Sequence, residues 1–199
     1  MSDILIRPAV PEDAAGLLSI YAPYVEDTPI TFAWEVPSLE AFRDRMVRIL
    51  GDHPYLAAER DGELVGYACT GPFVGRAAYG WSAETTIYLR RDCRGQGLGR
   101  KLYGALEEVS RARGILNLYA CIGDPETEDE HLTRASQRFH EKMGYRLVGR
   151  FDRCGYKFGR WYHMIWMEKL LGGHGARPRP VIPFRELEPK VLRSAGLTG

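Results

Sequence analysis

A glycine-rich turn in the middle of the chain holds the residues best suited to bind an anion. The run Arg94-Gly95-Gln96-Gly97-Leu98-Gly99 has glycine at every second position, so few side chains cover its backbone N–H groups. The turn is predicted to follow a strand and to open a helix, and the amino end of a helix favours negative charge. Positive charge surrounds it, at Arg90, Arg91, Arg94, Arg100 and Lys101. These features predict a cradle for a diphosphate, and therefore a nucleotide-containing cofactor.

Two well-known phosphate-binding loops do not match this turn. The dinucleotide fingerprint requires G-x-G-x-x-G in a first β-α-β unit, whereas the glycines here are spaced G-x-G-x-G. The phosphate loop of nucleoside triphosphatases ends in Gly-Lys-Ser/Thr, whereas Gly99 is followed by Arg100, Lys101 and Leu102. Neither loop therefore describes the turn, and an ordinary glycine turn is the remaining structural alternative.

The segments around the turn alternate between helix-like and strand-like patterns. Apolar residues recur at helical spacing in residues 12–21, 39–50, 98–113 and 132–143. Strands are predicted over residues 4–7, 55–59, 64–70, 84–89, 116–122, 145–154 and 162–170. Ser38 and Gly114 are suited to begin and end helices, and Asp61-Gly62 is a hairpin turn signal. The order predicts an α/β (α+β) fold, with a mixed, mostly antiparallel sheet of about 6–7 strands flanked by about four helices.

Proline marks two segments outside these elements. Residues 22–37 contain Pro23, Pro29 and Pro37 and are predicted to form a loop. Residues 172–199 are also rich in proline and are predicted to be an extended tail outside the core, either mobile or packed over the domain or a partner. The chain is therefore divided into a domain over residues 1–171 and a tail over residues 172–199.

The composition limits the class of protein. Lys and Arg total 27 against 26 for Asp and Glu, which argues against a nucleic-acid binder. No two of the four cysteines form a C-x-x-C pair, so no metal site is predicted. The amino terminus lacks a signal pattern, and no apolar run approaches the roughly 20 residues that span a bilayer. We therefore expect a reduced, cytoplasmic protein that does not bind membranes.

The spacing R-x-x-G-x-G at Arg94, Gly97 and Gly99 resembles the acetyl-coenzyme A pyrophosphate loop of the GNAT superfamily of N-acetyltransferases. Further runs are similar to its phosphinothricin N-acetyltransferase branch: Gly71-Pro72-Phe73, Arg76-Ala77-Ala78-Tyr79, Trp81-Ser82-Ala83-Glu84, Phe139 to Tyr145 and Gly155 to Trp161. The likeness reaches about Leu171. It implies the GNAT fold, acetyl-coenzyme A (acetyl-CoA) as co-substrate, direct transfer in a ternary complex and a homodimer. The implied acceptor is a small amino acid or a toxic analogue such as phosphinothricin or methionine sulfoximine.

The resemblance also implies roles for particular residues. Glu84, in the W-x-A-E context, would be the general base, and partial burial beside Tyr79, Trp81 and Tyr88 would raise its pKa. A backbone N–H near Ile87, Tyr88 and Leu89 would stabilise the oxyanion, and the same strand would bind the pantetheine arm. A surface glutamate at a strand start is the alternative for Glu84.

The resemblance also implies which residues would contact the cofactor. The cradle would be Arg94, Gly95, Gln96, Gly97, Leu98, Gly99 and Arg100. His140 stands where many members carry a tyrosine that protonates the leaving thiolate; it would act as that acid, or only contact the cofactor, or be structural. Members often have a cofactor-binding Asn early in the same helix, which this chain lacks, so Thr133 or Ser136 would replace it.

Phe32, Arg76 and Tyr79 match positions that line the acceptor pocket in the branch. The guanidinium of Arg76 could pair with both oxygens of a substrate carboxylate, although a loop arginine on the surface is an equal alternative. Two other functions stay open: a non-catalytic acyl-CoA sensor, and acetylation of a protein amino terminus or lysine. An open groove near Tyr79 would favour the latter.

Overall fold

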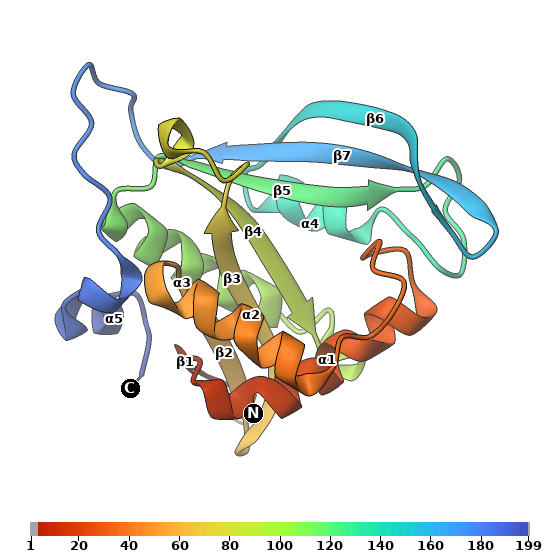
Figure 1. Cartoon of the computed structure of the whole chain (residues 1–199), viewed down its shortest axis with the longest axis horizontal. Helices are drawn as coiled ribbons and strands as arrows, with labels where there is room; N and C mark the ends of the chain where they lie inside the picture. The colour runs from red at the N-terminus through yellow and green to blue at the C-terminus, as the bar shows by residue number, and fades with distance from the viewer. Residues whose placement is uncertain (1–3, 199) are drawn as a thin grey trace.

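A seven-stranded sheet runs through the computed structural model, which describes residues 4–198 (Figure 1). Its strands are β1 (Ile4–Pro8), β2 (Tyr55–Arg60), β3 (Glu63–Pro72), β4 (Ser82–Leu89), β5 (Asn117–Asp124), β6 (Arg146–Lys157) and β7 (Arg160–Leu170). They lie in the order β1-β2-β3-β4-β5-β7-β6, and all neighbours are antiparallel except β4 and β5. The predicted mixed, mostly antiparallel sheet is confirmed. Residues 1–3 and 199, which the predicted domain and tail include, lie outside the described residues.

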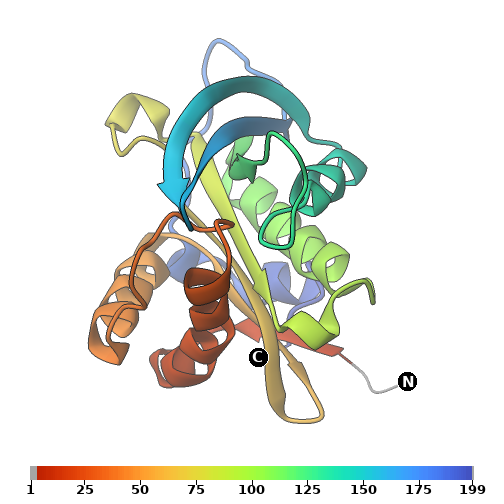
Figure 2. The same cartoon turned by 90° about the vertical axis from the view of Figure 1, so that its right-hand side faces the viewer.

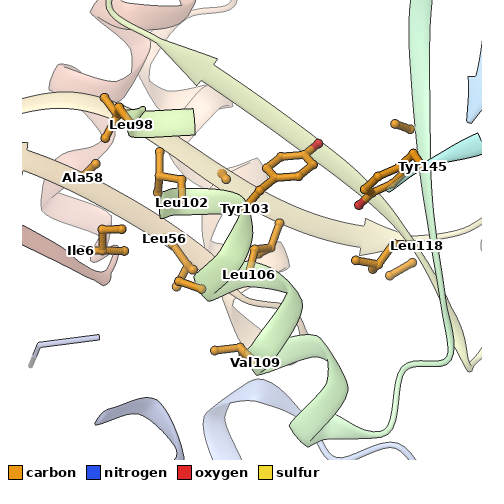
Figure 3. Packing of buried hydrophobic residues seen from close by; sticks show 14 of the residues in the cluster. Ile6, Leu56, Ala58, Leu98, Leu102, Tyr103, Leu106, Val109, Leu118 and Tyr145 are labelled. Atoms are coloured by element: carbon orange, nitrogen blue, oxygen red, sulfur yellow. The ribbon is translucent and has the colours of Figure 1, made fainter. Parts of the chain in front are cut away.

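Helices cover both faces of this sheet (Figures 1 and 2). On one face, α1 (Ala14–Asp27) and α2 (Leu39–Asp52) bury a cluster of side chains against β2 and β3. On the other lie α3 (Leu98–Arg113), α4 (Ala135–Lys142) and α5 (Pro189–Ser194), and α3 is central to a second cluster (Figure 3). Short 3-10 turns are η1 (Pro11–Asp13), η2 (Ala77–Tyr79), η3 (Arg91–Cys93) and η4 (Phe184–Glu186). Within residues 4–198, no helix combines the length and the hydropathy that crossing a membrane requires.

Glycine sets both ends of α3. Gly97, before its first residue, has φ +82°, and Gly114, after its last, has φ +97°; both are left-handed conformations that favour glycine. Between them Leu98, Leu102 and Leu106 are at most 1% exposed. Burying one leucine side chain stabilises a fold by about 1.5–3 kcal/mol. The predicted apolar stripe therefore anchors α3 to the sheet, and with it the glycine turn.

The helix α1 is longer than the sequence predicts. It continues through Pro23 to Asp27, where a loop was expected over residues 22–37. Proline costs the helix a hydrogen bond, but Tyr24 and Val25 are at most 4% exposed, and the Tyr24 ring packs edge-on against Tyr88 at 4.9 Å. The prediction was wrong there because apolar burial outweighs the missing N–H of Pro23.

Two further boundaries differ from the prediction. The helix expected over residues 132–143 begins only at Ala135, because Asp129 Oδ1 accepts hydrogen bonds from the backbone N–H groups of His131 and Leu132 and holds a turn there. The closing strand pair extends through residues 155–161, and a turn with positive φ at Phe158 and Gly159 joins β6 to β7.

The tail from Val181 on packs over the domain, one of the predicted alternatives, whereas residues 172–180 are exposed. Phe184 and Leu197 are 8% and 3% exposed and belong to the cluster around α3. Near the end of the chain, the N–H of Thr198 donates to the carbonyl of Ile6 at 2.9 Å. The expectation that this tail lies outside the core is wrong, because its apolar side chains bury themselves against α3 and the sheet. The division between residues 171 and 172 stays a prediction.

We expect Ser38→Ala to lower the free energy of unfolding by about 1 kcal/mol. Ser38 Oγ accepts a hydrogen bond from the N–H of Ala41 at 3.1 Å, as predicted for the residue that begins α2. Denaturant-induced unfolding measures the change. Ser19→Ala is the control, because the Ser19 hydroxyl donates to the carbonyl of Gly16 within α1 and caps no helix start. Equal losses for the two variants would contradict the capping role.

Candidate active site

The sheet opens between its two parallel strands. Residues 82–84 of β4 pair with residues 117–119 of β5, and the pairing ends at Glu84 and Tyr119. Beyond that point β4 stays paired with β3 as far as Leu89, whereas β5 stays paired with β7 as far as Asp124. The strands therefore diverge (Figure 1), and within residues 4–198 the edge of β4 that faces β5 has no strand partner after Glu84.

The opening holds a cavity of about 310 Å³. Side chains alternate along β4, so Thr85 and Ile87 face α3, while Glu84, Thr86 and Tyr88 face α1 and α2. The cavity reaches both sides of the opened sheet. Its lining consists of residues 30–32, 84–88 and 120–123 with Tyr103, Leu132, Ser136, His140 and Met164.

Glu84 lies in this lining at the point where the strands part. Its carboxyl is half-buried, and burial raises its pKa above the ordinary value. A raised pKa makes a carboxylate a stronger base, provided that the pH keeps it ionised. The structure therefore places a half-buried carboxylate in the wall of the cavity, at the position that the sequence analysis selected.

The glycine turn lies at the other end of β4, before α3. Gly95 and Gly97 have φ of +74° and +82°, and no atom outside their chain neighbours lies within 4 Å of the place where a Cβ would stand. The backbone here is thus exposed at the amino end of a 16-residue helix. Gly99, in contrast, packs against Phe139, whose ring lies 3.2 Å from the place that a Cβ would take. The first two glycines leave a bare surface suited to an anion, and the third allows close packing.

Charges near the turn fall into two groups. Arg90 pairs with Glu63 and Asp92, and Arg91 pairs with Asp27, so part of their charge is neutralised. Arg94 instead lies over the ring of Tyr24 at 4.9 Å, with its Nε 3.3 Å from the hydroxyl. Arg100 and Lys101 are exposed on the first turn of α3. The cations best placed to meet an incoming anion are Arg94, Arg100 and Lys101.

The family model of the acetyltransferase (GNAT) domain matches residues 6–166 of the chain. The chain belongs to this family. A phosphinothricin N-acetyltransferase from Streptomyces coelicolor is 34% identical over 174 residues, which are 85% of this chain and 98% of that protein. An L-methionine sulfoximine/L-methionine sulfone acetyltransferase from Pseudomonas paraeruginosa is 32% identical, covering 82% of this chain and 92% of that one.

A solved structure has a similar fold. The phosphinothricin acetyltransferase from Sinorhizobium meliloti, in complex with AcCoA, superposes with a TM-score of 0.82 at 30% identity, covering 90% of this chain and 94% of that chain. The resemblance seen in the sequence is thereby confirmed. The protein is an N-acetyltransferase of the GNAT fold.

A buried hydrogen-bonded chain lies on the α3 side of the acetyltransferase cavity. His140 Nε2 is 2.9 Å from the hydroxyl of Tyr103, which is 3.0 Å from Thr85 Oγ1. His140 Nδ1 lies 2.8 Å from the carbonyl of Ser136, and because a carbonyl only accepts, Nδ1 carries the hydrogen. Burial lowers the pKa of His140 to about 4, so the ring is neutral at pH 7, and its unprotonated Nε2 lies beside the Tyr103 hydroxyl, which donates its own hydrogen to Thr85 Oγ1.

Acid should destabilise the acetyltransferase through His140. Its folded-state pKa of about 4 lies below the unfolded value of 6.5, so the unfolded chain binds more protons between these values. Stability is full above pH 6.5 and falls as the pH drops towards 4, by about 2 kcal/mol at pH 5. Unfolding of wild type and His140→Gln at pH 7 and pH 5 measures this; the variant should lose less stability on acidification. Equal losses would contradict a neutral, buried His140.

The predicted cofactor residues divide by position. Ile87, Tyr88 and Ser136 line the cavity, whereas Leu98 is a core residue of α3. The Leu89 carbonyl accepts a hydrogen bond from Tyr24 at 2.6 Å.

Two polar side chains among the predicted cofactor-binding residues, those of Gln96 and Thr133, form hydrogen bonds within the protein. Gln96 donates to the carbonyl of Asp92 and accepts from Arg60. Thr133 precedes α4, and its Oγ1 accepts from the N–H of Ala135. Of the two substitutes for the missing Asn, only Ser136 therefore lies at the cavity.

The predicted acceptor residues are not all brought together. Phe32 lines the cavity, but Arg76 and Tyr79 are exposed at η2 and lie outside the lining. Tyr79 packs edge-on against Phe73, which stacks on Tyr119 at 4.2 Å, so η2 joins an aromatic wall next to the strand partner of Glu84. The roles of these three residues stay predictions.

Sequence reasoning missed the other lining residues, namely Ile30, Thr31, Thr85, Thr86, Tyr103, Ala120, Cys121, Ile122, Gly123, Leu132 and Met164. Tyr103 could have been found, because it follows Leu102 in the apolar stripe and carries a hydroxyl that needs a partner when buried. The others belong to loops or strands whose approach depends on the divergence of β4 and β5, which no local pattern encodes.

Proposed function

We propose that this N-acetyltransferase moves the acetyl group of acetyl-CoA to the amine of a small amino acid or a toxic analogue of the phosphinothricin or methionine sulfoximine type. The observation that carries the proposal is the cavity between the diverging β4 and β5, with Glu84 in its wall and the glycine turn at the end of β4. The names of the two relatives and the acetyl-CoA in the similar solved structure support the substrates.

In the proposed mechanism Glu84 accepts a proton from the substrate ammonium, directly or through water. The free amine attacks the thioester carbon and forms a C–N bond, and the carbonyl oxygen becomes negative. A backbone N–H of residues 87–89 would stabilise that oxygen, since this edge of β4 lacks a strand partner. The C–S bond then breaks, the electron pair leaves with sulfur, and the nitrogen gives up its second proton, which ends on the thiolate, so that the neutral amide and the free thiol remain. No covalent enzyme intermediate forms.

His140 would pass a proton to the departing thiolate: its neutral Nε2 takes up the second proton of the amine nitrogen and gives it to sulfur. His140 lines the cavity, and its Nε2 lies within hydrogen-bond distance of the Tyr103 hydroxyl. The imidazole is neutral at rest, since burial lowers its pKa to about 4. A thiolate forming nearby would raise the affinity of the imidazole for this proton, while the Tyr103 hydroxyl keeps its own hydrogen on Thr85 Oγ1.

A thiol-release assay tests the proposed function. Purified protein with acetyl-CoA is offered phosphinothricin, methionine sulfoximine, methionine sulfone and the common amino acids, and mass spectrometry identifies the acetylated product. A peptide with a free amino terminus belongs in the panel, because Tyr79 is exposed and lies outside the lining of the cavity. An N-blocked acceptor is the control. Binding of acetyl-CoA without thiol release on any amine would favour a sensor.

We also propose a homodimer. The edge strand β6 exposes apolar side chains at Leu147, Val148 and Phe151, each more than half exposed, and Trp161 of β7 is 58% exposed. An edge strand with an apolar surface favours pairing with another chain. Sedimentation should give twice the chain mass of 22.5 kDa, and Phe151→Glu should shift the protein towards the monomer. A monomer at all concentrations would contradict this proposal.

The cytoplasm is the proposed location, without binding to membranes or nucleic acid. The four cysteines are free thiols, and two of them, Cys121 and Cys154, are exposed. Exposed thiols persist in a reducing compartment. The formal net charge of +1 gives no general attraction to nucleic acid. Fractionation of cells that produce the protein would test this location.

A further inference from the structure

The ammonium group of Lys157 is buried, and its hydrogen bonds all go to main-chain carbonyls. Lys157 is the last residue of β6 and is 3% exposed. Its Nζ donates to the carbonyls of Val25 at 2.6 Å, Thr28 at 2.9 Å and Thr31 at 3.1 Å. An ammonium group has three hydrogens, so all of its donors are used. Burying a charge in this way is costly unless its hydrogen bonds are complete.

These carbonyls belong to the end of α1 and to the loop that follows. The last carbonyls of a helix have no N–H partner within it, and α1 lacks the glycine that often satisfies them. Side chains satisfy these carbonyls instead: Thr28 Oγ1 donates to the carbonyl of Tyr24, and Lys157 Nζ donates to the carbonyl of Val25. A cation at the carboxyl end of a helix is also favourable for its dipole. Lys157 therefore completes α1 and fixes the start of the loop.

The same loop forms one wall of the cavity through Ile30, Thr31 and Phe32. A second residue of β6 holds it as well, because the Phe32 ring lies so close to Gly155 that a Cβ added there would be 2.5 Å away from it. Figure 2 shows the loop after α1 lying against the end of the β6–β7 hairpin. Gly155 thus leaves room for the ring, while Lys157 binds the backbone on either side of Pro29.

We propose that Lys157 is a positioning residue for the acceptor. Its ammonium group holds the backbone of residues 25–31 against β6, so that Thr31 and Phe32 form the wall of the cavity that also contains Glu84. This inference rests on the proposed function, since it assigns the loop to the acceptor rather than to acetyl-CoA. The glycine turn and α3 are not among the bonded partners of Lys157.

The test is Lys157→Met, which keeps the length of the side chain and removes its donors. The variant leaves three carbonyls without this donor, and releasing the loop should raise the KM for the acceptor at least about tenfold, the effect expected from one unsatisfied buried group alone, with the KM for acetyl-CoA within about twofold of wild type. Hydrogen exchange should become faster in residues 28–33 and stay unchanged in residues 94–100. Lys190→Met is the control, because Lys190 is exposed and pairs only with Glu188; it should change neither KM.

An unchanged acceptor KM in folded Lys157→Met, or an equal rise in both KM values, would overturn the inference. If the variant does not fold, Lys157→Arg gives the same test, because a guanidinium keeps the charge but cannot place three hydrogens of one nitrogen on converging carbonyls. If the wild type acetylates no amine, the proposed function is wrong, and this inference is wrong with it. If the wild type is active and the Lys157→Met variant has a normal KM for the acceptor, the inference alone is wrong.

Discussion

Glu84→Gln is expected to lower turnover by about 10²–10³-fold at neutral pH. Glutamine keeps the shape of the side chain but cannot accept the proton of the substrate ammonium. Because the carboxyl lies in the wall of the cavity, away from the glycine turn, the affinity for acetyl-CoA should stay within about twofold of wild type. Steady-state kinetics with an amine acceptor and calorimetry with acetyl-CoA measure the two quantities separately.

The dependence of kcat/KM on pH gives a second test of the role of Glu84. Burial raises the pKa of Glu84, so on acidification its carboxylate takes up a proton at a higher pH than an ordinary glutamate does. The kcat/KM of the wild type should fall as the pH drops through that pKa. The Glu84→Gln variant should lack this fall in kcat/KM at acidic pH. Its loss of turnover relative to the wild type should shrink at alkaline pH, where the free amine is abundant. Glu108→Gln, on the exposed face of α3, is the control. Equal rates for wild type and Glu84→Gln across pH would remove Glu84 from the mechanism.

Much of the fold follows from local patterns in the chain. The stripe of Leu98, Leu102 and Leu106, with glycine at either end, specifies α3, and Asp61-Gly62 specifies the β2–β3 hairpin with positive φ at both residues. Where the prediction failed, distant contacts decided the structure. Proline signals in residues 22–37 suggested a loop, yet burial of Tyr24 against β4 extends α1 past Pro23 to Asp27.

The site could be predicted only in part. Glu84 and the glycines are recognised because short motifs surround them, and the divergence of β4 and β5 places Glu84 and His140 on one cavity. Lys157 could not be assigned a role, since its partners lie more than 120 residues earlier in the chain. Arg76 was selected for its chemistry, but the structure leaves it on an exposed loop. A motif thus specifies which group is present, while strand pairing decides what it faces.

Gly97→Val is expected to raise the KM for acetyl-CoA by about 10-fold to 100-fold. Gly97 has φ +82°, which costs an ordinary residue about 1–2 kcal/mol and a β-branched residue more. Apart from Gly97 and its two chain neighbours, no atom of residues 4–198 lies within 4 Å of the place that a Cβ would take, so valine meets no clash and acts through the backbone. The turn would leave the left-handed conformation, and its N–H groups would no longer converge on a diphosphate. Initial rates at varied acetyl-CoA give the KM.

Gly196→Val separates this loss from general destabilisation. Gly196 has φ +79° just after α5, again with open space within 4 Å of where a Cβ would stand, and α5 lies at the carboxyl end of α3, whereas the glycine turn is at its amino end. Both variants should lose similar stability on thermal unfolding, but only Gly97→Val should weaken acetyl-CoA binding. Gly97→Asn should retain most of the affinity, because asparagine tolerates the left-handed conformation. A normal KM for acetyl-CoA in Gly97→Val would show that the turn is not the diphosphate cradle.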